Sequence, residues 1–248
     1  MSGHSKWHNI RLRKAKVDAV RGKLFTKVAR EIIMAAREGG GNPDTNARLK
    51  LAVQKARDVS MPQDNIKRAI QRGTGEIEGA SYEQINYEGY GPGGVAVMIQ
   101  VMTDNRNRAV GEIRNIFARN GGNLGESGCV AWMFAERGVI VVNRDVADEE
   151  TILGVAIEAG ADDVRTSDQS YEIVTEPGNL QAVRASLEAN QIAFESAEVS
   201  MIPNNTVTVE PSDVSKVLRL MDALEDHDDV QQVYANFDIP DELLEEAA

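Results

Sequence analysis

The sequence predicts an α+β protein with a helical N-terminal domain and two ferredoxin-like βαββαβ domains, one inserted into the other. Two observations support this prediction. Residues 1–75 show helical periodicity, whereas strand and helix patterns alternate from residue 80 onward. The charge divides near the same place: residues 1–72 hold 17 Lys and Arg against 6 Asp and Glu, and residues 73–248 hold the other 10 against 33.

Three helices are predicted in the N-terminal region. The first covers 17–38, where apolar residues recur at helical spacing, and it ends at the glycines 39–41. Its other half carries four cations: Lys23, Lys27, Arg30 and Arg37. The second helix covers 45–57. The third begins near Ser60, whose spacing from Gln63 fits a capping box. It directs three cations outward: Lys67, Arg68 and Arg72.

The body contains one complete βαββαβ set between two βαβ units. The complete set has strands at 139–143, 163–166, 171–175 and 194–201, with helices at 149–159 and 179–189. The unit before it has strands at 95–103 and 129–134 around a helix that Asp104 can cap. The unit after it has strands at 207–210 and 230–236 around a helix at 213–225.

Each outer βαβ unit alone would leave an unpaired strand edge, so we expect the two to form one domain. The predicted parts are a basic helical domain, a discontinuous α/β domain, an inserted ferredoxin-like domain and an acidic tail. Their ranges are 1–75, 76–135 with 204–240, 136–203 and 241–248. The alternative is two sequential domains followed by a separate tail.

The sequence lacks the patterns of the common catalytic and cofactor sites. Glycine clusters match neither a P-loop nor a dinucleotide fingerprint, and His4 and His8 have no third metal ligand nearby. Cys129 lies in an apolar run, as a small buried hydrophobe would. We therefore expect no enzyme, no cofactor and no metal. No apolar run reaches membrane-spanning length and the N-terminus has no signal core, which predicts a cytoplasmic protein without membrane contact, and we expect a monomer.

The positive signal is the basic N-terminal segment, residues 6–16, which combines five cations with one tryptophan. Lysine and arginine bind phosphates and release counterions, so this segment and the first helix predict a nucleic-acid-binding head. The predicted binding residues are Lys6, Trp7, Asn9, Arg11, Arg13, Lys14, Lys16, Lys23, Lys27 and Arg30. The tryptophan either stacks on a base or anchors the segment on the core. The alternative for the whole head is that it pairs with the acidic body.

A second candidate patch is the polar run 103–108, with Arg106 and Arg108 as its cations. It opens a helix, where backbone N–H groups favour anions. The alternative is a well-capped helix start with solvated arginines.

Several long motifs occur together and in order: SGHSKWHNIR (2–11), RGKLFTK (21–27), EGGGNPDTNARL (38–49), MPQDNIKRAIQRGTG (61–75), YEGYGPGGVAVM (87–98), TDNRNR (103–108), GGNLGESGCVAWMF (121–134) and AEVSMIP (197–203). With these motifs the chain resembles the YebC/PmpR family. The resemblance implies a three-domain α/β protein that acts in gene expression. It implies a DNA-binding transcriptional regulator or, as the alternative, a translation factor on ribosomal RNA, with the acidic body available to the ribosome or another protein partner.

Overall fold

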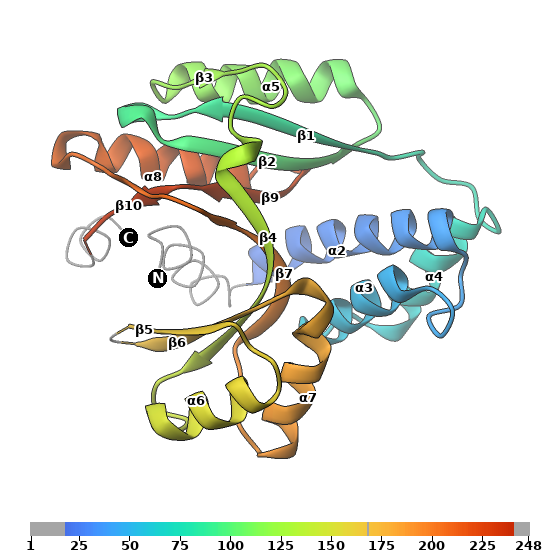
Figure 1. Cartoon of the computed structure of the whole chain (residues 1–248). Coiled ribbons are helices and arrows are strands. Elements are labelled where there is room, and N and C mark those ends of the chain that lie inside the picture. Colours follow the sequence, from blue (N-terminus) through green and yellow to red (C-terminus); the bar gives the residue numbers. More distant parts are fainter. Residues whose placement is uncertain (1–17, 168, 241–248) are drawn as a thin grey trace.

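The computed structural model describes residues 18–167 and 169–240 of the chain. Three parts are visible in Figure 1: a group of helices on one side, an upper sheet with two helices, and a lower sheet with two helices. Residues 1–17 and the predicted acidic tail lie outside the described residues. In the described ranges, no helix is long and apolar enough to cross a membrane.

The N-terminal part consists of α2 (Asp18–Gly39), α3 (Ala47–Asp58) and α4 (Gln63–Thr74), which confirms the three predicted helices. Ile32, Leu49 and Ile66, one from each helix, are almost completely buried in a shared core. Gly40, directly after α2, has a φ of 84°, which glycine adopts without strain. The predicted capping box at the start of α4 is wrong. Pro62 precedes the helix without a side-chain cap, and Ser60 has a φ of 61° in the turn before it.

The upper sheet has the antiparallel order β3-β1-β2-β9, and α5 (Arg106–Arg119) and α8 (Pro211–Glu225) cover one of its faces (Figure 1). Its strands are β1 (Glu83–Tyr90), β2 (Ala96–Thr103), β3 (Asn123–Leu124) and β9 (Val230–Ala235). Ile99, Phe117 and Met221 lie in the core between sheet and helices. Because β9 pairs with β2, segments from before and after the lower sheet share one sheet.

Two strand predictions for this region are wrong. Residues 129–134 do not form a strand: η2 (Ala131–Met133) is a turn of 3-10 helix, and the next strand begins at Phe134. The reason is the buried carboxylate of Glu88 on β1, which accepts hydrogen bonds from the backbone N–H groups of Gly128, Val130 and Ala131 at 2.7–2.8 Å. A chain curled around one carboxylate cannot offer the same N–H groups to a neighbouring strand.

The other wrong prediction concerns the strand before α8. The short β8 (Val207–Thr208) does not join the upper sheet but pairs in parallel with β10 (Phe237–Asp238). In the upper sheet the position beside β2 is occupied by β1, a strand that was not predicted. The helix α5 starts one residue later than expected, since the Asn105 side chain, not that of Asp104, accepts the capping hydrogen bond from the backbone N–H of Arg108.

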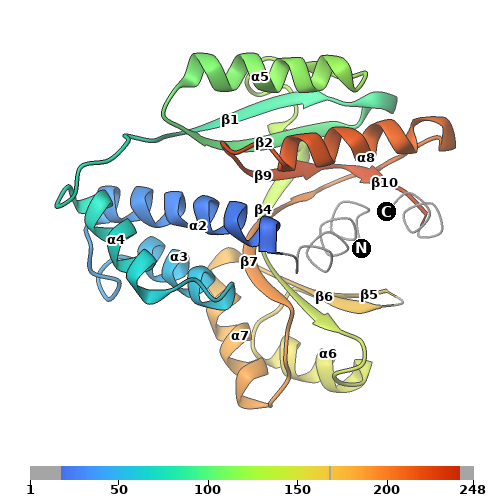
Figure 2. The ribbon, with the colours of Figure 1, turned by 180° about the vertical axis from the view of Figure 1, so that it is seen from behind.

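The lower sheet confirms the predicted ferredoxin-like plan. Its elements are β4 (Phe134–Asn143), α6 (Glu149–Glu158), β5 (Asp163–Thr166), β6 (Ser170–Thr175), α7 (Leu180–Ala189) and β7 (Ser196–Pro203). All strands are antiparallel in the order β5-β6-β4-β7. The long strands β4 and β7 pair from Phe134 with Pro203 to Val141 with Ser196, and both connect the lower sheet to the upper one (Figures 1 and 2). The exact domain boundaries stay a prediction.

Candidate nucleic-acid interface

Most of the predicted nucleic-acid-binding residues lie outside the described part of the chain. These are Lys6, Trp7, Asn9, Arg11, Arg13, Lys14 and Lys16. The structure shows the surroundings of the other three, Lys23, Lys27 and Arg30, all on α2.

Lys23 and Lys27 contact the end of helix α8. Their Nζ atoms donate hydrogen bonds to the backbone carbonyls of Asp226, at 3.3 Å, and Glu225, at 2.7 Å. The last carbonyls of a helix have no partner within the helix and carry the negative end of its dipole. The two lysines therefore satisfy the C-terminal end of α8 within the molecule.

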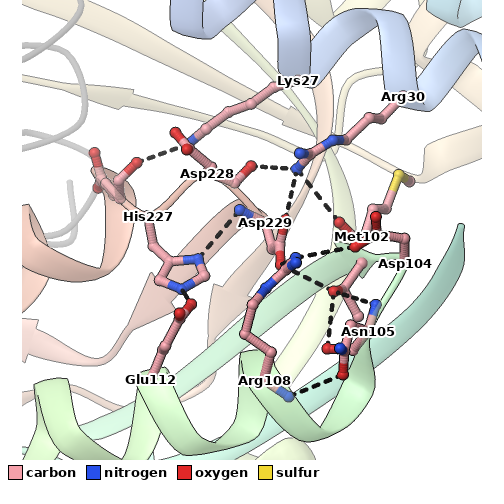
Figure 3. Close-up of polar contacts among 12 residues, drawn as sticks. Lys27, Arg30, Met102, Asp104, Asn105, Arg108, Glu112, His227, Asp228 and Asp229 are labelled. Atoms are coloured by element: carbon pink, nitrogen blue, oxygen red, sulfur yellow. Dashed lines mark hydrogen bonds and ion pairs between the residues drawn. The ribbon is translucent and has the colours of Figure 1, made fainter. Parts of the chain in front are cut away.

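Arg30 makes the most extensive of these contacts (Figure 3). Its Nη1 lies 3.1 Å from Oδ1 of Asp229, and it also donates to the carbonyls of Asp228 and, at 3.4 Å, Met102. The guanidinium lies over the ring of Tyr82, 5.2 Å from its centre. Only 13% of the Arg30 side chain and 3% of the Asp229 side chain are exposed, so water screens this pair weakly.

Asp229 is the centre of a larger polar cluster. Its Oδ2 accepts hydrogen bonds from Nη2 of Arg108, at 2.7 Å, and Oγ1 of Thr103, at 2.9 Å. Burial alone would raise the pKa of Asp229, but the Arg108 and Thr103 hydrogen bonds and the charge of Arg30 hold that pKa below its ordinary value. The backbone N–H of Asp229 donates to Nδ1 of His227, whose Nε2 lies 2.8 Å from a carboxylate oxygen of Glu112. Figure 3 shows these side chains converging from α2, α5 and the turn between α8 and β9.

We call this group of Arg30, Thr103, Arg108 and Asp229 the Asp229 cluster. It joins the basic helical part to the upper sheet. For Lys23, Lys27 and Arg30 the structure thus shows contacts with the acidic body, which is the alternative considered for the head. Their role in nucleic-acid binding stays a prediction.

Of the two arginines in the second predicted patch, only one belongs to the Asp229 cluster. Arg108 is bound to Asp229 and, at 3.0 Å, to Asp104. Arg106 is exposed, and its charge opposes the burial that raises the pKa of Tyr87. The run 103–108 is therefore a well-capped helix start in which one of the two arginines has a carboxylate partner.

Other cations of the helical part remain exposed. Lys67, Arg68 and Arg72 lie on the outside of α4 as predicted, and α3 adds Lys50 and Arg57, which the sequence prediction missed. Lys50 and Arg57 are seven residues apart, two helical turns, and so lie on the same side of α3. None of these five cations has an ion-pair partner within residues 18–167 and 169–240. We call them the α3–α4 cations.

Two observations among the described residues concern metal binding and thiol chemistry. In the described ranges, no group of three or more His, Cys, Asp and Glu could hold a metal ion. Burial and the nearby charge of Glu88 raise the pKa of the Cys129 thiol, which favours its unreactive protonated form.

The fold and the site define a class of protein: a three-part α+β molecule whose basic helical part is joined by ion pairs to an acidic body of two sheets. Two family models match the chain, "TACO1/YebC protein N-terminal domain" over residues 5–76 and "TACO1/YebC second and third domain" over residues 82–237. The chain belongs to the TACO1/YebC family, which confirms the resemblance seen in its motifs.

Similar proteins extend over the full length. One from Pelotomaculum thermopropionicum is 61% identical over 97% of this chain and 100% of its own length, and one from Moorella thermoacetica is 59% identical over 99% of both. Each is named "Probable transcriptional regulatory protein". The crystal structure of a conserved hypothetical protein from Aquifex aeolicus has a TM-score of 0.84 and 49% identity, covering 92% of this chain and 94% of that one. The names of the relatives support a regulator of the YebC type.

Proposed function

We propose that this chain is a YebC-type regulator that binds nucleic acid through its helical domain, with duplex DNA as the target. The observation that supports the proposal most is the exposure of the α3–α4 cations without carboxylate partners among the described residues. The protein has a net charge of −12, so cations gathered on one domain are not explained by the overall composition. The relatives are named as probable transcriptional regulatory proteins, and because transcription takes place on duplex DNA we choose DNA as the target.

The cations of two helices, α3 and α4, would then contact phosphate groups of the nucleic acid. Arg68 and Arg72 are one turn apart on α4, and Lys50 and Arg57 are two turns apart on α3. Spaced cations on helices suit phosphates of a backbone, because each contact releases a condensed counterion. The predicted segment 6–16 would add further contacts, whereas Lys23, Lys27 and Arg30 would mainly hold the helical domain in place.

Ribosomal RNA is the second candidate target. Helix α4 exposes cations together with only two amide side chains, Gln63 and Asn65, so its capacity to read base edges in a major groove is small. Structured RNA is recognised largely through shape and backbone contacts, which need fewer base-reading side chains.

Fluorescence anisotropy with charge-reversal variants tests the proposal. The probes are a labelled 30-base-pair duplex DNA and a labelled RNA hairpin. The double variants K67E/R68E and K50E/R57E should each weaken binding about tenfold, since each removes two phosphate contacts.

A matched control is K216E/R219E on α8, which changes the net charge by the same amount at two exposed cations of the body. This variant should bind as the wild type does. Equal weakening in all three variants would show that only overall charge matters, and binding unchanged in the α3 and α4 variants would refute the proposed interface.

A further inference from the structure

A polar pocket lies where the three parts of the molecule meet. Its volume is about 310 Å³, which is within the usual range for small-molecule sites. The lining residues come from α3 of the helical part, from β1, β2 and β9 of the upper sheet, and from the long strands β4 and β7 that connect the two sheets (Figures 1 and 2). Junctions between domains are a common place for a small ligand to bind.

Most polar groups of this pocket can accept hydrogen bonds. Glu136 on β4 is exposed, and its carboxylate has neither an ion-pair partner nor a hydrogen-bond partner within residues 18–167 and 169–240. The side chain of Gln100 on β2 likewise makes no hydrogen bond to another described residue. The hydroxyls of Ser200 and Tyr234 add two more oxygens to the lining. A ligand with several hydrogen-bond donors therefore matches the pocket best.

The arginine that lines the pocket already has partners. Arg48 on α3 donates through Nη1 to a carboxylate oxygen of Glu38 and through Nη2, at 2.6 Å, to the side-chain oxygen of Gln84. Arg137 on β4 is not part of the lining, and it is paired with Glu176 at 3.1 Å. Because carboxylates balance both arginines, an anionic ligand would gain little from either of them.

The charges at the pocket are mainly negative. Burial raises the pKa of the Tyr234 hydroxyl most, and the carboxylates of Glu198, Glu31 and Glu136 raise it further. Lys55 on α3 balances part of this charge, with its Nζ 2.9 Å from Glu31 and 3.9 Å from Glu198. Together with the paired arginine and glutamate, four carboxylates and two cations lie at or near the pocket. A positive ligand is therefore favoured over a negative one.

The types of acceptor indicate which kind of cation fits. A divalent metal ion prefers several charged oxygens, and no group of three or more His, Cys, Asp and Glu in the described ranges could hold one. An ammonium group donates three hydrogen bonds, which one carboxylate together with neutral amide and hydroxyl oxygens can accept. Val199 and Met201 on β7 add apolar atoms to the lining, against which a short aliphatic stem can pack.

We infer that this pocket binds a primary ammonium group on a short aliphatic stem, with Glu136 as its counter-charge and Gln100 as a hydrogen-bond acceptor. A free amine and the lysine side chain of another protein both present this group. A ligand bound by α3, the upper sheet and β7 at once would also fix the helical part on the body. The inference does not depend on the proposed nucleic-acid function.

NMR titrations of the full-length ¹⁵N-labelled chain at pH 7 test the inference. The probes are pentylamine, its uncharged analogue pentanol, and N-acetyl-lysine N-methylamide, which presents a lysine side chain as a peptide does. Pentylamine should bind with a dissociation constant on the order of 1 mM, because so small a ligand makes few contacts. It should shift the side-chain amide signal of Gln100, which Q100M identifies by its loss, and pentanol should not. Binding of pentylamine alone would indicate a free amine, and tighter binding of the lysine derivative would indicate a lysine side chain.

Two variants that remove the same charge separate the pocket from general electrostatics. E136Q should weaken the binding of the amine about fivefold. E150Q changes an exposed carboxylate on α6 that has no partner among the described residues, and it should bind as the wild type does. Circular dichroism checks that both variants are folded. The inference is overturned if neither amine binds, if pentanol binds as tightly as pentylamine, or if E136Q weakens binding no more than E150Q does.

Discussion

Arg30 on α2 and Asp229 in the turn between α8 and β9 form an ion pair, with Nη1 and Oδ1 3.1 Å apart and both side chains largely buried. The same carboxylate is bound by Arg108 at the start of α5. One aspartate, in the turn before β9, therefore binds both the helical domain and the helix α5 that covers the upper sheet. Its removal has several measurable consequences.

The substitution Asp229→Asn should lower the free energy of unfolding by about 3 kcal/mol at pH 7, because it leaves Arg30 without its buried counter-charge. Urea unfolding followed by circular dichroism measures this. The control is Asp228→Asn, an exposed neighbour that contributes only its backbone carbonyl to Arg30. The control should change stability by less than about 0.5 kcal/mol. Equal effects of the two substitutions would show that the Asp229 cluster is not stabilising.

The contribution of Asp229 should also depend on pH. Its pKa is lower in the folded protein than in the unfolded chain, so the carboxylate favours folding wherever it is charged in both states. The contribution is complete above the ordinary aspartate pKa of about 3.9 and is lost as the pH falls through the lower folded-state value. The stability difference between wild type and Asp229→Asn should thus be constant from pH 5 to 7 and narrow below about pH 4. If the stability difference between the two proteins instead narrowed near pH 6, a titrating group other than Asp229 would be responsible.

Deleting residues 136–203 should leave a soluble protein that unfolds cooperatively. The upper sheet takes its strands from outside this segment, and Phe134 and Pro203 are paired across neighbouring strands, so a short Gly/Ser linker can join the cut ends. Thermal unfolding by circular dichroism and size-exclusion chromatography measure the outcome. An aggregated or molten product would show that the upper sheet and its helices cannot fold without residues 136–203.

Much of this fold follows from local sequence. The three N-terminal helices and the lower sheet match their predictions within a few residues, since amphipathic spacing and turn residues act over short distances. The strand β1 was not predicted, although Ile85 and Tyr87 alternate with Gln84, Asn86 and Glu88 as in a half-buried strand, because the glycines from Gly89 onward indicate a turn at its end. The error at 129–134 has a different origin, because Glu88 reorganises that loop from a distant point in the chain.

The site was harder to predict than the fold. A helical wheel correctly places Lys27 and Arg30 on the polar side of α2, but it cannot show that the turn around Asp229 covers this side. The spacing of Lys50 and Arg57 was a usable signal for the exposed side of α3. Which cations stay exposed depends on tertiary packing, and only the structure gives that.

The two candidate targets, duplex DNA and ribosomal RNA, predict different results in a DNA competition assay and a sucrose gradient. Few side chains of segment 6–16 suit bidentate contacts with bases, so discrimination among duplex DNA sequences should be about tenfold or less, below the ~10³ of dedicated regulators. If ribosomal RNA, the second candidate, is the target, the protein should sediment with ribosomes at moderate salt, and replacing Lys6, Trp7 and Arg11 by alanine should abolish this. A sucrose gradient beside a competition assay with random and promoter DNA measures both. Strong preference for one promoter without ribosome association would favour transcription alone.

The salt dependence of binding tests the central claim most directly, namely that the helical domain holds nucleic acid through phosphate contacts. Dissociation constants for the labelled duplex are measured by anisotropy from 50 to 200 mM salt. With about four to six phosphates neutralised, the logarithm of affinity should fall with the logarithm of salt at a slope of roughly −4 to −5. The slope should become shallower by about 2 in K67E/R68E and in K50E/R57E, and it should not change in K216E/R219E. A slope near zero for the wild type, or the same slope in all four proteins, would contradict the account.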